Sequence, residues 1–234
     1  MKLMRFLSLA IVAVLLVSCN KQGVTNKTLT SEIDSVSYAI GMDVAKNVKT
    51  SFDEFDTELF IQGFMNVTDS TNMQLDANEA QQLIRAYFQK KQQEELVKRQ
   101  EKAKENKEAG EKFLAENKTK DGVVTTESGL QYIVLKEGTG ATPVTTDRVK
   151  VHYHGTLLDG TVFDSSVDKG TPAEFGVTQV IKGWTEGLQL MKEGAKYKFF
   201  VPSDLAYGSN PRPGGKIEPN STLVFDVELL EILK

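Results

Sequence analysis

A proline-free stretch rich in Lys, Glu, Gln and Ala, residues 90–118 ("KKQQEELVKRQEKAKENKEAGEKFLAENK"), divides the chain into two halves of different character. These residue types have high helix propensity, and opposite charges at i,i+4 stabilise a helix without tertiary contacts. Because the stretch has few apolar residues to bury, we expect one long helix that projects through water as a stalk. Its acidic and basic residues are interleaved and the net charge of the chain is −4, so neither feature predicts nucleic-acid binding.

Apolar side chains at helical spacing between residues 35 and 88 predict three helices that lead into the stalk. From Ser35 onwards, an apolar residue recurs at every fourth position. We expect Asp56 to cap the second helix and the acidic capping box Asp76–Glu79 to begin the third. The apolar residues are Val36, Ile40, Val44, Val48, Leu59, Phe60, Phe64, Val67, Ala80, Leu83, Ile84, Tyr87 and Phe88. They are too many for so small a unit to bury alone, which predicts a homodimer through these helices.

Beyond residue 128 the apolar residues alternate with polar ones, which predicts antiparallel β-strands. The alternating residues are Leu130, Tyr132, Val134, Val149, Val151, Tyr153, Phe199, Val201, Leu223, Phe225, Val227 and Leu229. The dipeptide Asp159-Gly160 is typical of a hairpin turn, and one short helix is expected at Trp184–Met191. The predicted fold class is α+β, with a curled antiparallel sheet packed on one short helix. An all-α dimerisation domain with a long stalk helix precedes it.

The N-terminus has the three parts of an export signal. Lys2 and Arg5 form a positive segment, and an apolar run too short to span a membrane follows at Phe6–Val17. The sequence "LVSC", which ends at Cys19, resembles the lipobox of bacterial lipoproteins, in which the signal is cut before a cysteine that becomes lipidated. Cys19 is the only cysteine and has no disulfide partner; the alternative is a plain secretory signal with a chance cysteine.

These changes of pattern predict the boundaries of the chain's parts. Residues 1–18 are expected to be the lipoprotein signal and residues 19–30 a tether. Residues 31–118 would form the helical domain with its stalk, residues 119–128 a linker, and residues 129–234 the β-rich domain.

Both histidines of the chain, His152 and His154, lie in "VKVHYHGTLLDGTVFDSS", residues 149–166. Residues two apart in a strand share a face, so the pair points away from the face that carries Tyr153. A catalytic zinc needs about three protein ligands, and the chain has no further His or free Cys to supply them. No Gly-x-Ser-x-Gly nucleophile motif is present either. We therefore expect no metal site and no general base here, and the functional residues on the Tyr153 face.

Four stretches carry a resemblance to a known family: "VKVHYHGTLLDGTVFDSS", "VIKGWTEGLQLMKEG", "VPSDLAYGS" and "PNSTLVFDVELL". From Gly129 to the C-terminus, the sequence resembles the FKBP-type peptidyl-prolyl cis–trans isomerases in the order and spacing of these stretches. The N-terminal half, with its lipoprotein signal, helices and "SYAIGMDVAKNV" segment, resembles the dimeric macrophage infectivity potentiator-like branch.

The resemblance implies a proline-binding pocket without cofactor or metal. Its catalytic residues would be Tyr153, Asp164, Tyr207 and Phe225, and its substrate-binding residues Phe163, Phe175, Val180, Ile181, Trp184 and Ile217. In the family the tryptophan forms the floor, and the backbone N–H of the isoleucine and a tyrosine hydroxyl bind substrate carbonyls. Asp164 would be buried beside Tyr153. Two departures affect substrate preference: Ala173 replaces an aromatic residue, and the loop 208–219 is long and polar, with Lys216 in place of an apolar residue.

The implied function is acceleration of X-Pro bond rotation in exported proteins, through an apolar pocket that stabilises the twisted amide without a covalent intermediate. The implied partners are proline-containing polypeptides, a second copy of the chain, and a membrane reached through lipid on Cys19. The expected location is the bacterial cell envelope, and Asn20 after the cysteine favours the outer membrane. Two alternatives stay open. One is a holdase chaperone with a weak or vestigial isomerase site, and the other is a surface virulence or adhesion factor.

Overall fold

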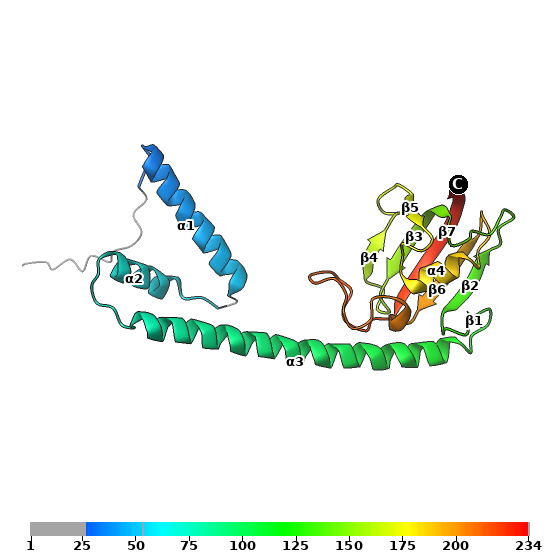
Figure 1. Cartoon of the computed structure of the whole chain (residues 1–234), viewed down its shortest axis with the longest axis horizontal. Coiled ribbons are helices and arrows are strands. Elements are labelled where there is room, and N and C mark those ends of the chain that lie inside the picture. The colour runs from blue at the N-terminus through cyan, green and yellow to red at the C-terminus, as the bar shows by residue number, and fades with distance from the viewer. Residues whose placement is uncertain (1–26, 53, 234) are drawn as a thin grey trace, which may run out of the picture. The chain divides into compact units, whose positions relative to one another are not determined.

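The computed structural model describes residues 27–52 and 54–233, which belong to two compact units divided between Asp76 and Ala77 (Figure 1). The predicted export signal and Cys19 lie outside the described residues. Among the residues that are described, no helix is long and apolar enough to cross a membrane.

The first unit contains helices α1 (Glu32–Ser51) and α2 (Thr57–Thr68). The helix α1 begins before the predicted start at Ser35, because Ser31 and Asp34 form a capping box that satisfies two backbone N–H groups. Asp56 caps α2 as predicted, and its carboxylate accepts hydrogen bonds from two backbone N–H groups of the first turn. Neither helix buries any residue within this chain.

The second unit begins with the long helix α3 (Ala77–Asn117), which confirms the helix predicted across the Lys- and Glu-rich stretch. Ion pairs at i,i+4, such as Lys104 with Glu108 at 3.9 Å, run along its exposed side. Because each such exposed pair contributes little, the helix is stabilised mainly by propensity over most of its length.

The last turns of α3 pack against the β-rich domain, so the expectation that the whole stretch projects through water is wrong for them. Gly110 is buried against Thr222, and the rings of Phe113 and Phe200 are 5.7 Å apart. The side-chain amide of the buried Asn117 donates a 3.0 Å hydrogen bond to the side-chain oxygen of Gln131. The apolar residues that make this contact are too few and too widely spaced to produce a periodic signal.

The β-rich domain is a single antiparallel sheet. Its strands are β1 (Val124–Thr125), β2 (Gln131–Lys136), β3 (Arg148–Thr156), β4 (Val162–Ser165), β5 (Ala173–Gly176), β6 (Lys196–Val201) and β7 (Leu223–Leu233). Their order is β1-β2-β6-β7-β3-β4, with β5 paired to β3. The helix α4 (Lys182–Leu188) lies against the sheet, and a 3-10 turn (Ser203–Leu205) follows β6 (Figure 1). This arrangement confirms the predicted curled antiparallel sheet on one short helix.

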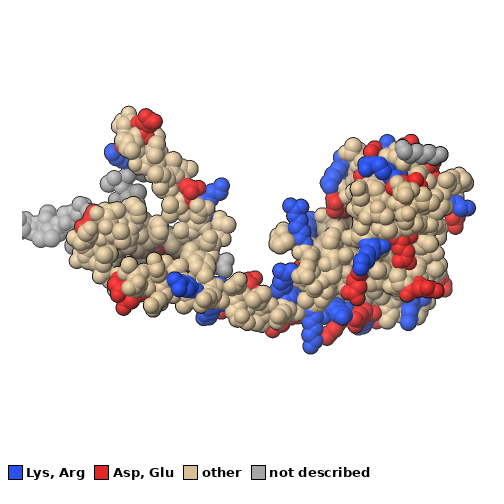
Figure 2. Space-filling view, in the orientation of Figure 1, with Lys and Arg blue, Asp and Glu red and all other residues tan. Residues whose placement is uncertain are grey.

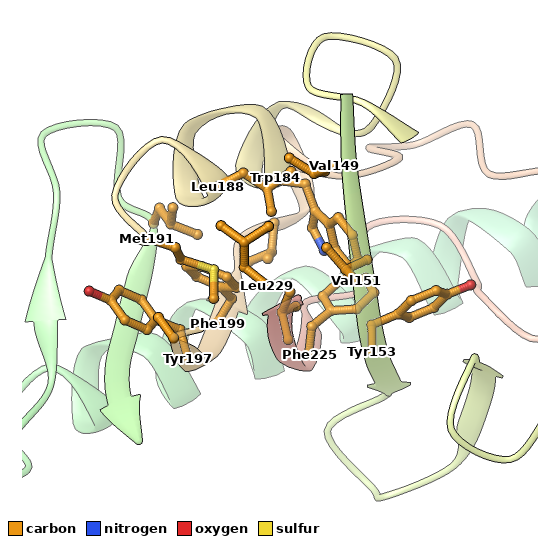
Figure 3. Close-up of a cluster of buried hydrophobic side chains, with 14 of the residues drawn as sticks. Val149, Val151, Tyr153, Trp184, Leu188, Met191, Tyr197, Phe199, Phe225 and Leu229 are labelled. Atoms are coloured by element: carbon orange, nitrogen blue, oxygen red, sulfur yellow. The ribbon is translucent and has the colours of Figure 1, made fainter. Parts of the chain in front are cut away.

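The core lies between the sheet and α4 (Figure 3). Val149, Val151 and Tyr153 of β3 face it, and β7 contributes alternate residues from Leu223 to Leu229, as their period of two predicts. Asp159-Gly160 forms the predicted turn between β3 and β4, where Gly160 has a φ of +86° that favours glycine.

The two histidines lie on the face of β3 opposite Tyr153, as predicted. The Nδ1 atom of His152 is 3.1 Å from Ser166 Oγ, and that of His154 is 3.0 Å from Ser165 Oγ. Within residues 27–52 and 54–233, no group of three or more His, Cys, Asp or Glu side chains is arranged to hold a metal ion.

Candidate functional site

A cavity of about 680 Å³ lies where α4, the ends of β3 and β7, and the loop after the 3-10 turn meet. Its volume is in the usual range for a small-ligand site. All the pocket residues that the family resemblance implies line it: Tyr153, Phe163, Asp164, Phe175, Val180, Ile181, Trp184, Tyr207, Ile217 and Phe225. Residues far apart in the sequence thus reach one cavity because β3, β7 and α4 pack on a common core.

Trp184, from the first turn of α4, forms the base of the cavity and is only 4% exposed. The rings of Tyr153, Phe175 and Phe225 stand at 86°, 90° and 78° to the indole plane, with centroids 5.3 to 5.9 Å away. Edge-to-face contacts of this kind stabilise a fixed arrangement of aromatic rings. The three rings therefore form walls around the indole, and the cavity has an aromatic interior.

Two glycines allow these elements to approach closely. A Cβ atom on Gly187 would lie 2.6 Å from the Phe199 ring, so this glycine lets α4 lie directly on β6. A Cβ atom on Gly155 would lie 2.7 Å from the Phe163 ring and 2.9 Å from the Phe225 ring. Gly155 stands opposite Phe225 in the pairing of β3 with β7, and its lack of a side chain leaves room for this aromatic pair.

A polar network lies at the rim of the cavity. The Tyr153 hydroxyl donates a 2.5 Å hydrogen bond to Asp164 Oδ2, and it is directed away from the Trp184 ring (Figure 3). The ammonium group of Lys169 donates a 2.6 Å hydrogen bond to Asp164 Oδ1. The Asp164 side chain keeps 42% of its surface exposed, so the expectation that it is buried is wrong. Asp164 belongs to β4, the edge strand of the sheet, and the turn that follows β4 brings Lys169 to it.

These contacts set the protonation states of the rim. Burial alone would raise the pKa of Asp164, but the hydrogen bonds from Lys169 and Tyr153 outweigh it and hold the pKa below its ordinary value. Burial and the hydrogen bond to Asp164 raise the pKa of Tyr153. The pKa of Tyr207 is also raised, mainly by burial and to a smaller extent by the negative charge of Asp164. At neutral pH the rim therefore holds one carboxylate and two protonated phenols.

Two hydrogen-bond donors at the cavity have no acceptor among the described residues. They are the backbone N–H of Ile181, just before α4, and the hydroxyl of Tyr207. The indole N–H of Trp184 is a third donor, buried and also without a partner in that part of the chain. Free donors around an apolar cavity can bind the carbonyl groups of a polypeptide backbone.

The cavity also contains four residues that the sequence did not identify: Gln179, Pro211, Arg212 and Gly215. The last three belong to the loop 208–219, whose unusual length and polarity were the available signal. Lys216, the residue of this loop that the sequence did indicate, lines the cavity as well. Lys216 donates a 2.6 Å hydrogen bond to the Val162 carbonyl and so ties this loop to β4. Ala173, by contrast, is not one of the lining residues, so Phe175 alone represents β5 in the cavity.

Two family models match the chain. One, described as FKBP-type peptidyl-prolyl cis-trans isomerase, matches residues 140–230. The other, described as the domain amino terminal to FKBP-type peptidyl-prolyl isomerase, matches residues 33–134. Together they span both the helical half and the β-rich half.

Similar proteins carry the same description. The chain is 45% identical over 205 residues to a probable FKBP-type peptidyl-prolyl cis-trans isomerase FkpA of Neisseria meningitidis, covering 86% of this chain and 75% of the relative. It is 42% identical over 208 residues to the outer membrane protein MIP of Legionella longbeachae, covering 88% of each. The crystal structure of FkpA from Escherichia coli superposes with a TM-score of 0.67 at 34% identity, covering 88% of this chain and 98% of that one.

Proposed function

The chain belongs to the FKBP-type peptidyl-prolyl cis-trans isomerase family, and we propose that it turns the X-Pro bonds of exported proteins in the aromatic cavity above Trp184. One observation carries the assignment of the site. The tryptophan base, its perpendicular aromatic walls and two free backbone-binding donors converge on one cavity.

The proposed mechanism needs no nucleophile. Rotation about an X-Pro bond is slow because amide resonance opposes twisting, with a barrier of roughly 18–20 kcal/mol. The planar amide has the greater charge separation and is better solvated by water than the twisted amide. A cavity that excludes water therefore lowers the cost of the twisted form relative to the planar one.

The donors hold the substrate while its proline ring lies against Trp184. The N–H of Ile181 and the hydroxyl of Tyr207 bind backbone carbonyls on either side of the rotating bond. The Asp164 carboxylate fixes the Tyr153 ring through the hydroxyl, and it places a negative charge at the rim of the cavity. The hydrogen-bond donors thus restrain the ends of the substrate while the bond between them turns.

The test is a proline-limited refolding assay with the mature chain and a Phe225→Ala variant. We expect the variant to lose most of its activity, because it removes the aromatic wall that packs on both Trp184 and Phe163. A matched variant, Tyr132→Phe, changes an aromatic residue that stacks on Tyr197 and does not line the cavity, and it should keep normal activity. Normal rates in a folded Phe225→Ala protein would refute the assignment.

The helical half is proposed to form a homodimer. Its exposed apolar side chains support this assignment: Ile33, Val36, Tyr38, Ile40, Met42, Val44, Leu59, Phe60, Phe64, Met65 and Val67. A second copy of the same surface would bury them, and the match to the family's N-terminal domain covers them. Sedimentation equilibrium should give a dimer for the mature chain and a monomer for Ile40→Lys. Ala141→Lys, at an exposed position of the β-rich domain, is the control, and a monomeric wild-type chain at micromolar concentration would contradict the proposal.

The lipid anchor and the envelope location are proposals that rest on the N-terminal sequence. Cys19 would carry the lipid, and the name of the Legionella relative, an outer membrane protein, favours the outer membrane. In a bacterial expression host, the wild-type chain should incorporate labelled palmitate and sediment with membranes. Cys19→Ser should do neither, and membrane association that survives this change would refute the anchor.

A holdase chaperone activity is the second candidate, and the exposed apolar side chains of α1 and α2 favour it. If the helical half binds unfolded clients independently, suppression of aggregation will survive Phe225→Ala while isomerase activity does not. Parallel loss of both activities in the folded variant would restrict the function to isomerisation.

A further inference from the structure

A second hollow lies on the other side of the loop 208–219, between this loop and α3. Its volume is about 680 Å³, and residues 92–102 of α3 form its helical wall. Pro211, Arg212, Gly215 and Ile217 line both this hollow and the aromatic cavity. The two therefore share one rim, and an extended polypeptide that leaves the cavity over this rim enters the second hollow, which we call the α3 groove.

Cationic side chains without carboxylate partners lie along this route. Arg99 donates a 3.5 Å hydrogen bond to the Ser209 carbonyl, and Lys216 donates to the Val162 carbonyl. Neither these two residues nor Arg212 forms an ion pair within the described part of the chain. The backbone contacts of Arg99 and Lys216 orient these two cations but leave their positive charge uncompensated.

The other charged residues of the groove are already paired. The ammonium group of Lys98 lies 3.4 Å from Glu95, and that of Lys102 lies 3.8 Å from Glu218. The remaining charge is therefore positive, although the chain as a whole has a net charge of −4. Figure 2 shows Lys and Arg side chains gathered on this side of the β-rich domain, next to α3.

Between the charges the groove has an apolar surface. The side chain of Leu96 is 48% exposed on the helical wall, and Pro211, Pro213, Pro219 and Ile217 lie on the loop side. Prolines carry no backbone N–H, so the loop side of the groove has few hydrogen-bond donors that could pair with one another. An extended chain with aliphatic and acidic side chains fits such a surface, because its carboxylates reach the free cations and its apolar groups cover Leu96 and the prolines.

We propose that the α3 groove binds the client segment that flanks the isomerised proline and selects segments carrying Asp or Glu a few residues from that proline. This inference rests on the proposed catalytic cavity, since the groove acts only on a client held there. It assigns to α3 a direct role in substrate selection. The α3 groove would thus raise turnover of acidic clients without taking part in the rotation itself.

The experiment compares kcat/KM of the full mature chain on short and long peptides. One substrate is a neutral four-residue X-Pro peptide, and the others are longer peptides with three Glu or three Gln residues on one side of the proline or the other. We expect the Glu peptide on one of the two sides to exceed its Gln partner by about two- to fivefold at low ionic strength, as for exposed ion pairs. The preference should disappear at high salt.

Arg99→Gln is the discriminating variant, because Arg99 lines the groove and not the aromatic cavity. It should bring the Glu-to-Gln ratio close to one and leave the rate on the neutral peptide unchanged. Lys104→Gln makes the same charge change on α3 outside the groove and should keep the ratio. Equal rates on all long peptides, an unchanged ratio in Arg99→Gln, or an equal loss in Lys104→Gln would each overturn the proposal. Absence of turnover of the neutral peptide would instead refute the catalytic site.

Discussion

The packing of α3 against the β-rich domain leads to a prediction at Gly110, the glycine in the middle of this contact. A Cβ atom added there would lie 2.2 Å from Thr222 Oγ1 and 3.2 Å from Thr222 Cβ. Thr222 is only 4% exposed, so it cannot swing into water to make room. Gly110→Ala must therefore push the helix away from the sheet.

The sign of the effect depends on two opposing contributions. An Ala in place of a helix-interior Gly stabilises a helix by roughly 0.5–1 kcal/mol. Overpacking a close contact costs roughly 1–3 kcal/mol. Because the nearest approach at Gly110 is far inside van der Waals distance, we expect the second contribution to dominate, with a net loss of about 1–2 kcal/mol. For a unit of this size, that loss lowers Tm by roughly 2–8 °C.

The assay is thermal and urea unfolding followed by the fluorescence of Trp184, the only tryptophan of the chain, which reports on the second unit. Thr222→Ala provides the matched background, because it removes Oγ1 and leaves the Cβ contact. Gly110→Ala should cost less in that background than in the wild type, giving a measurable coupling energy. A rise in Tm for Gly110→Ala alone, or the same loss in both backgrounds, would refute the close contact.

Three further changes test the site. Tyr207→Phe should lower kcat/KM about two- to tenfold, the effect of one lost hydrogen bond, in a peptide assay on folded protein. Lys169→Met should raise the pKa of Asp164, whose ordinary value is about 3.9, and move the acid limb of the pH–activity profile upward. Because the folded-state pKa of Asp164 is lowered, its contribution to stability is present above that ordinary value and is lost as pH falls through the folded-state value. An unmoved acid limb would contradict the role of Lys169. Replacement of His152 and His154 by Gln should lower Tm and keep catalysis, and an inactive but fully folded double variant would show otherwise.

Much of the fold could be predicted from the sequence because its signals are local. The caps at Asp56 and the hairpin at Asp159-Gly160 depend on neighbouring residues only, and the alternation in β3 and β7 depends on which face of one strand is buried. The start of α1 at Glu32 precedes the apolar period that predicts this helix, and the Ser31 capping box that sets it is also a local signal.

The candidate site depended on a different kind of information. The aromatic residues around Trp184 were selected by their resemblance to family motifs, and the structure brings them to one cavity. Their perpendicular arrangement and the exposure of Asp164 could not be inferred, because both depend on how α4 and the edge of β4 pack. The loop around Arg212 lines both the aromatic cavity and the α3 groove, and only the folded chain shows this.

The sequence by itself determined the α-helices and the longer strands, which faces those strands bury, and the family to which the motifs point, since period, capping and motif order are properties of contiguous residues. Only the tertiary structure decided that the end of α3 is a docked part of the isomerase domain. It also decided that Arg99 on that helix lies in a groove beside the catalytic rim. The contact between Gly110 and Thr222 depends on the shapes of two surfaces far apart in the chain, and no local pattern encodes that complementarity.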